Sequence, residues 1–412
     1  MRRSTILLAA TIAILGCGTG AGTASAPAPA RQGPVAAPSA PGRAPAQDRL
    51  YLTDGSSLKV VSGATGDLLR TLPTGAAPAD WSRIFSLASG PAGVTVQAVD
   101  ALTGQVQHAV SAPSWADEVR VSANGAWLAL GSRSDSKVTR FQVRDSDLAR
   151  QPVEVELKGR FVFDGLSGDG QRLYLLQMGS GGSYQVRVFD VGKKQLAADP
   201  IVDKTDSSVV MSGTAVNSLT TRDGLLQLTL YERNQKGQAF VHALPIGSPV
   251  PFAYCVDLPA PGSGWTLAAA PDGERFYAVN TISNQVVTLT TRGLDPPRVN
   301  QAKLLAGAGP RGLVAIAEAK EGVGRPALAV SADGSTLFLD GPGMVTSVEA
   351  RSMRRSGVAS VGAAVGSLAT APSGWLYAMS SGGQLLRIDP STMKVSWTSG
   401  PVFKGFELLH AS

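Results

Sequence analysis

Residues 265–290 read WTLAAAPDGERFYAVNTISNQVVTLT, and this stretch decides the fold. It contains an apolar run, a Pro-Asp-Gly turn, a second apolar run, an Asn-containing loop and a third apolar run. Asp followed by Gly supplies the positive-φ positions that a two-residue hairpin turn requires. Residues 325–350 repeat the same order as RPALAVSADGSTLFLDGPGMVTSVEA. The unit is therefore predicted to be a set of antiparallel strands joined by tight turns.

Similar apolar runs recur along the chain. We count eight, which begin at residues 49, 83, 126, 172, 225, 275, 336 and 375. Six are entered through a tight turn whose glycine is residue 125, 170, 224, 273, 334 or 374, at intervals of 45, 54, 49, 61 and 40 residues. Such intervals are typical of four-stranded propeller blades, and no long segment has helical i, i+3, i+4, i+7 spacing. We predict an all-β propeller over residues 48–412, with eight blades favoured and seven possible.

The two ends of this region complement each other. The chain enters it in mid-unit at Arg49-Leu50-Tyr51, without an innermost strand, and finishes on GFELLHAS, which is typical of an innermost strand without its turn. We therefore expect residues 404–410 to pair with residues 49–54 and to close the ring. In the second unit, the short stretch GAAPADWS (75–82) contains no clear first strand.

Two families share parts of this pattern. Residues 265–290 and 325–350 resemble the YVTN-type and WD-like propeller repeats. VQAVDALTGQV (96–106), LKVVSGATGDLL (58–69) and LLRIDPSTMKVSW (385–397) are similar to pyrroloquinoline-quinone-type repeats, with Met393 in place of a glycine and Trp397 at the position of the docking tryptophan. Both resemblances imply a β-propeller. The quinone enzymes carry a catalytic Asp and metal ligands at the hub, and no residue here matches them, so no cofactor is expected.

The N-terminus has the form of an export signal. Arg2 and Arg3 precede the apolar run ILLAATIAIL (6–15), which is too short to span a bilayer. It ends in Ile-Leu-Gly-Cys (14–17), which resembles the lipobox of bacterial lipoproteins. We expect residues 1–16 to be removed and Cys17 to carry the lipid. Cleavage of an ordinary signal near residues 23–26 is the alternative.

Residues 17–47 are rich in Ala, Pro and Gly and hold too few large apolar side chains to build a core. We expect them to form a flexible tether between the lipid and the propeller. The protein is then expected in the cell envelope, outside the cytoplasm and anchored to a membrane, which is the outer membrane if the organism has one.

Charge and cysteine content narrow the function. Lys and Arg number 37 against 31 Asp and Glu, without a long basic run, so no nucleic-acid partner is expected. Once Cys17 is lipidated, Cys255 has no partner for a disulfide. Cys255 lies in the apolar run PFAYCVDL with no His nearby in the sequence, so we interpret it as a buried small hydrophobic residue and not as a nucleophile.

Other catalytic or metal-binding patterns are missing from the sequence. His108, His242 and His410 lie in three different units without metal-ligand spacing, and we interpret them as structural or surface residues. Asp145 and Asp147 are expected in a solvated hairpin and not in a calcium site. We therefore predict a protein without enzymatic activity, without a metal and without a cofactor.

The longest connections suggest a binding face. Arg133 and Lys137 lie in the predicted loop 131–137, Tyr184 in the loop 179–185, and Val314 and Ile316 in the long segment 291–324. Long loops between compact elements are often binding elements. We predict a lipid-anchored scaffold that engages a protein or another envelope partner through one propeller face. An extracytoplasmic ligand sensor and a propeller hydrolase, lyase or quinoprotein with a site in the central channel are the alternatives.

Overall fold

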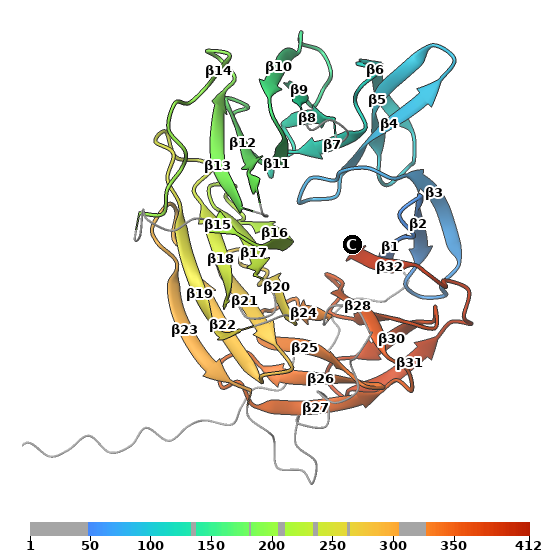
Figure 1. Ribbon diagram of the computed structural model, residues 1–412. Helices are drawn as coiled ribbons and strands as arrows, with labels where there is room; N and C mark the ends of the chain where they lie inside the picture. The colour runs from blue at the N-terminus through green and yellow to red at the C-terminus, as the bar shows by residue number, and fades with distance from the viewer. Residues whose placement is uncertain are drawn as a thin grey trace, which may run out of the picture. The chain divides into compact units, whose positions relative to one another are not determined.

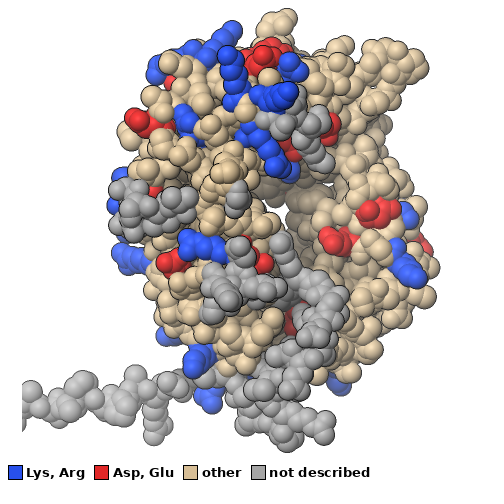
Figure 2. All heavy atoms as spheres, viewed as in Figure 1, with Lys and Arg blue, Asp and Glu red and all other residues tan. Residues whose placement is uncertain are grey.

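The computed structural model describes residues 48–132, 137–180, 183–204, 211–233, 238–261, 264–304 and 327–412. These residues form eight antiparallel sheets arranged as the blades of a ring, which confirms the predicted all-β propeller with eight blades (Figure 1). The ring surrounds a central opening, and Lys and Arg atoms are interspersed with Asp and Glu atoms on the face seen in Figure 2. No helix in the described part of the chain has the length and hydrophobicity needed to cross a membrane.

The strands of each blade run from the central opening outward. Blade 1 contains β32 (Glu407–Ala411), β1 (Arg49–Thr53), β2 (Ser57–Ser62) and β3 (Leu68–Pro73), and blade 2 contains β4 (Arg83–Gly90), β5 (Gly93–Asp100) and β6 (Val106–Ala112). Blade 3 contains β7 (Glu118–Val121), β8 (Trp127–Gly131), β9 (Val138–Asp145) and β10 (Val153–Lys158). Blade 4 contains β11 (Phe161–Leu166), β12 (Arg172–Met178) and β13 (Ser183–Asp190), and both β14 (Gln195–Leu196) and β15 (Met211–Ser212) pair with β13. Blade 5 contains β16 (Thr214–Thr220), β17 (Gln227–Glu232), β18 (Gln238–Leu244) and β19 (Tyr254–Pro261), and blade 6 contains β20 (Trp265–Ala269), β21 (Arg275–Asn280), β22 (Gln285–Thr290) and β23 (Arg298–Lys303). Blade 7 contains β24 (Leu328–Val330), β25 (Thr336–Gly341), β26 (Met344–Glu349) and β27 (Arg355–Ser360). Blade 8 contains β28 (Val365–Thr370), β29 (Leu376–Ser380), β30 (Leu385–Asp389) and β31 (Lys394–Thr398).

The two chain ends close the ring in blade 1, as predicted. Strand β32 pairs with β1, and Arg49 and Ser412 exchange two backbone hydrogen bonds of 2.9 Å. The buried carboxylate of Asp48 also accepts hydrogen bonds from the Ser373 hydroxyl (2.6 Å) and the Tyr377 hydroxyl (2.7 Å) of blade 8. Blade 1 is therefore joined to blade 8 by side chains as well as by packing.

Blade 2 has only three strands, which explains why the sequence shows no clear first strand there. Its innermost position is reduced to one bridge, in which Ala76 and Phe85 exchange backbone hydrogen bonds of 2.9 and 2.8 Å. Pro78 follows two residues later and has no N–H with which to extend the pairing.

The six predicted glycine turns join the first and second strands of their blades. Their glycines all have positive φ, from 69° to 95°. Asp169 shows how the turn is held: its Oδ1 accepts hydrogen bonds from Ser167 Oγ (2.5 Å) and Gln171 N (3.0 Å). Neighbouring strands are antiparallel, so these turns and the third-to-fourth-strand turns share one face, which we name the turn face. Asp48, the first described residue, and Ser412 lie on the turn face. The opposite face, which we name the loop face, carries the second-to-third-strand and blade-to-blade connections.

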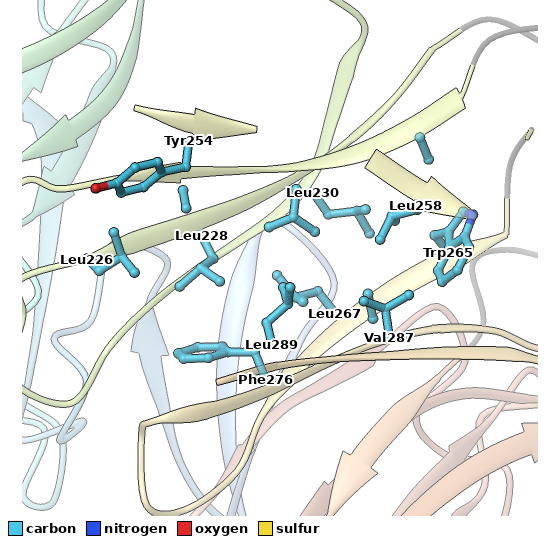
Figure 3. Close-up of a cluster of buried hydrophobic side chains, with 14 of the residues drawn as sticks. Leu226, Leu228, Leu230, Tyr254, Leu258, Trp265, Leu267, Phe276, Val287 and Leu289 are labelled. Carbon is cyan, nitrogen blue, oxygen red and sulfur yellow. The ribbon is translucent and has the colours of Figure 1, made fainter. Parts of the chain in front are cut away.

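The hydrophobic core fills the spaces between blades. Figure 3 shows the interface of blades 5 and 6, where Leu226, Leu228 and Leu230 point from blade 5 toward Leu267 and Phe276 of blade 6. The leucines are alternate residues, and alternate residues of a strand share one side of the sheet. The opposite side of the same strand must therefore face blade 4.

Candidate functional site

The structure describes two of the predicted binding residues. Lys137 is exposed just before β9, where its carbonyl accepts a hydrogen bond from Gly159 N (2.7 Å). Tyr184 lies in β13 and is only 3% exposed, so its predicted position on a surface loop is wrong. The strand extends further toward the loop face than the sequence suggested, because Tyr184 still pairs with Met178 of β12. Lys137 belongs to blade 3 and Tyr184 faces blade 5, so the structure does not bring them together.

The other predicted binding residues cannot be placed. Cys17, Arg133, Val314 and Ile316 lie outside the described residues.

Tyr184 belongs to a polar group in the interface of blades 4 and 5. We name this group the blade 4–5 cluster and define it as Asp164 of β11, Tyr184 of β13, Tyr231 of β17 and His242 of β18. Tyr184 and Tyr231 pack in one buried cluster with Phe240, and the ring of His242 lies edge-on to Tyr231 with centroids 6.2 Å apart. Tyr231 points to this interface because the leucines that alternate with it on β17 face blade 6.

The cluster contains five enclosed polar atoms. They are Asp164 Oδ2, the hydroxyls of Tyr184 and Tyr231, and both ring nitrogens of His242. The two tyrosine hydroxyls lie within hydrogen-bonding reach of each other, and the other three atoms have no hydrogen-bond partner among the described residues. A buried polar atom without a partner costs about 1–3 kcal/mol, so folded proteins leave few of them. Three such atoms beside two phenols in one interface are a set of polar groups that an ordered water or a polar ligand would satisfy.

Aromatic rings and one cation form the wall of the cluster on the side of the loop face. The rings of Tyr184 and Tyr231 stack with centroids 5.4 Å apart, and Tyr231 stacks on Phe240 at 5.1 Å. The guanidinium carbon of Arg233 lies 4.5 Å from the centroid of Phe240, and Arg233 Nε is also enclosed without a partner. The arrangement therefore offers the positive charge of Arg233 and three hydrogen-bond donors beside the carboxyl of Asp164. The donors are Arg233 Nε and the hydroxyls of Tyr184 and Tyr231.

Burial sets the charge states in the cluster. It raises the pKa of Asp164 to about 7 and lowers the pKa of His242 to about 4. Burial, together with the nearby charge of Asp164, also holds the pKa of both phenols above the usual range. At neutral pH the phenols and the imidazole are therefore uncharged, whereas Asp164 is divided between its protonated and ionised forms. A carboxyl poised in this way is typical of binding and active sites.

A β-bulge places Asp164. The register of β11 on β12 shifts between Phe163 and Gly165, so Asp164 is the extra residue of the bulge. Its carbonyl accepts a 2.7 Å hydrogen bond from Gln227 Nε2 of blade 5. Although the residue as a whole is partly exposed, its Oδ2 is enclosed. Bulges re-aim side chains and are frequent beside active sites, and the run FVFDGL gives no sign of one.

The pairing of β18 with β19 supplies Cys255 with the histidine that the sequence analysis did not find. His242 is directly opposite Cys255, and Asp203 Oδ2 accepts a hydrogen bond from Cys255 N (3.1 Å). Burial and the nearby Asp203 raise the pKa of the thiol to about 12, and His242 has a lowered pKa. An activated thiolate–imidazolium pair requires the opposite shifts. This pair therefore does not provide a nucleophile at neutral pH, and Cys255 is half-buried and not fully buried as expected.

The remaining titratable candidates lie apart from the cluster. His108 is in the exposed outer strand β6, and His410 is in β32. Asp145 accepts hydrogen bonds from the backbone of Ala149 and Arg150, and Asp147 pairs with Arg83 at 3.0 Å. Within the described ranges, no three His, Cys, Asp or Glu side chains are grouped so that they could hold a metal ion.

Comparison with known proteins shows the fold. No protein-family model and no curated protein matches the sequence. Among solved structures, apo AztD from Citrobacter koseri is 12% identical, with a TM-score of 0.58 over 89% of this chain and 98% of that one. A second AztD structure from the same organism is 11% identical, with a TM-score of 0.55 over 89% and 97% of the two chains.

The similar structures also include proteins named as enzymes. The periplasmic gluconolactonase PpgL of Pseudomonas aeruginosa is 19% identical, with a TM-score of 0.42 over 79% of this chain and 98% of that one. At their identities the two AztD likenesses establish the β-propeller fold alone, and one fold can serve enzymes and other proteins.

Proposed function

We propose that this protein is a non-catalytic binding propeller that holds a small polar ligand between blades 4 and 5. The observation that carries the proposal is the group of enclosed polar atoms in the blade 4–5 cluster, of which Asp164 Oδ2 and both ring nitrogens of His242 have no partner among the described residues. A ligand with hydrogen-bond acceptors would meet the hydroxyls of Tyr184 and Tyr231 and the guanidinium of Arg233. One of its donors would meet Asp164 Oδ2.

The charge states argue against nucleophilic catalysis in this interface. Nucleophilic catalysis needs an ionised or base-activated nucleophile. The two phenols of this cluster and the neighbouring thiol of Cys255 have raised pKa values. The imidazole of His242 has a lowered pKa, although it would be the natural general base. Uncharged donors held by packing are well suited to selecting a ligand by its hydrogen-bonding pattern.

The proposal places the protein in the cell envelope, anchored through Cys17. A protein or envelope partner would meet the loop face, where Lys137 is exposed. Replacement of Cys17 by Ser tests the anchor: metabolic labelling with a fatty acid should be lost, and labelling that persists would contradict it.

Native mass spectrometry of the purified full chain tests the ligand. We expect an added mass that is retained under native conditions and is released on denaturation. Tyr231→Phe should lose this mass, because the variant keeps the ring stack and removes one donor. Tyr277→Phe is the matched control, since Tyr277 is equally buried but belongs to the core between blades 6 and 7. If the wild type carries no added mass and no compound of a metabolite panel raises its melting temperature, the cluster holds only water and the proposal fails.

A further inference from the structure

A second, separate feature lies between blades 1 and 2, where the first-to-second-strand turn of blade 2 contains Trp81. This turn is built like the glycine turns: Trp81 N donates to Pro78 O (3.0 Å), and Asp80 Oδ1 accepts from Ser82 N (3.0 Å). Trp81 thus occupies the position that glycine occupies in six other blades, with φ at 52°. Side chains other than glycine are sterically disfavoured in this conformation, and such strain is often found at functional sites.

Stacking holds the indole of Trp81 in place. It lies parallel to the imidazole of His410, with centroids 4.8 Å apart and planes inclined by 2°, and its centroid is 4.9 Å from that of Tyr51. Burial lowers the pKa of His410 to about 4, so the imidazole is uncharged at neutral pH. Both partners belong to blade 1, and Trp81 therefore connects the three-stranded blade to the closing blade.

The indole forms one wall of a pocket of about 190 Å³. The pocket exists because blade 2 has a single bridge where other blades have an innermost strand, so no row of strand side chains fills this space. Apart from Trp81 and Gly75, its lining residues are mainly apolar: Thr53, Leu58, Thr74, Ala77, Ile84 and Leu409. The hydroxyl of Thr53 already donates a hydrogen bond to Ser57 O, so this polar group of the pocket wall does not need a ligand as its partner.

We propose that this pocket binds a small molecule with a single aromatic ring. An apolar cavity of about 150 Å³ accepts benzene, so a pocket of about 190 Å³ has room for one ring with a small substituent. The aliphatic walls contact the faces of a flat ring, and the indole of Trp81 adds the edge or face contact that aromatic pairs favour. The site is independent of the blade 4–5 cluster, because it shares no residue or blade interface with it.

Fluorobenzene is the probe for this site, followed by ¹⁹F NMR on the full chain. The wild type should broaden the fluorobenzene signal in a saturable way. Ala77→Leu should weaken binding at least tenfold, because the added side chain fills the pocket. Ala79→Leu is the matched control: it makes the same change two residues away at an exposed position of the same turn, and should bind as the wild type does.

A second variant keeps the test valid if Ala77→Leu lowers the melting temperature. Trp81→Gly introduces the residue that six other turns carry, so the turn can form, and it removes the aromatic wall; it should also weaken binding at least tenfold. Wild-type protein that leaves the fluorobenzene signal unchanged, or variants that bind like the wild type, would overturn the proposal. Fluorocyclohexane that binds as tightly as fluorobenzene would overturn the aromatic preference.

Discussion

Replacing Asp164 by Asn should make the stability of the protein less dependent on pH. The folded pKa of Asp164 is about 7, against an ordinary value of 3.8, so the difference is 7 − 3.8 = 3.2 units. One unit corresponds to about 1.4 kcal/mol, and the full effect is therefore about 4 kcal/mol. Because the pKa is raised on folding, Asp164 favours the folded state at pH values below 3.8, and this contribution is lost as the pH rises through 7.

Urea unfolding of both proteins between pH 4 and pH 8 measures this effect. The free energy of unfolding of the wild type minus that of Asp164→Asn should fall by up to about 1.4 kcal/mol per pH unit and level off above pH 7. The lowered pKa values of His242 and His410 affect both proteins equally and cancel in the difference.

Asp54→Asn serves as the control for the pH series. Asp54 has a pKa lowered to about 2 by hydrogen bonds from Ser57 and Ser56, so its contribution is lost only as the pH falls through 2. Its difference curve should be flat between pH 5 and pH 8. A curve for Asp164→Asn that is also flat, or that rises with pH, would show that the carboxyl of Asp164 is solvated or ion-paired in the folded protein and would refute the reasoning.

Three further predictions follow from the fold and the site. Deleting residues 407–412 exposes one edge of β1 and removes Ser412, the hydrogen-bond partner of Arg49. Thermal unfolding followed by circular dichroism should therefore show a much lower melting temperature. An unchanged melting temperature would contradict the closure of the ring by these strands. Gly55→Ala and Gly170→Ala both place a side chain at positive φ, which costs about 1–2 kcal/mol. Only the second meets Trp127, 2.2 Å from the new Cβ, so urea titration should show a further loss of about 1–3 kcal/mol. Cys255 should react with Ellman's reagent roughly a hundredfold or more slowly in the native protein than in urea, because its raised pKa leaves little thiolate; equal rates would contradict this.

Much of the fold could be predicted because its signals are local. A turn such as Asp272-Gly273 determines a hairpin within four residues, and the regular recurrence of that turn along the chain indicates the length of a blade. Closure could also be predicted, since each end of the chain lacks the part of a unit that the other supplies. Trp397 of blade 8 packs on Gly66 of blade 1.

The blade 4–5 cluster could not be predicted because it depends on long-range geometry. His242 and Cys255 are thirteen residues apart and become opposite neighbours only through the register of β18 on β19. Asp164 is aimed by a bulge that its sequence does not announce, and Tyr184 is buried by a blade that follows it in the chain. For the same reason, the turn at Asp80-Trp81 could not be recognised in the sequence. The conformation of Trp81 is maintained by stacking on His410, which is more than three hundred residues away.

The position of β1 has a mechanical consequence. It lies between β2 and β32, so it is hydrogen-bonded on both edges, and Asp48 at its start is bound to Ser373 and Tyr377 of blade 8. A force that enters the propeller through residue 48 is therefore divided between two ladders and a side-chain contact. A pull away from the turn face is directed along β1, across the direction of the ladder hydrogen bonds, so these bonds resist together and do not open one after another. The C-terminal strand acts as a second clamp on the strand through which any load on the preceding residues must pass.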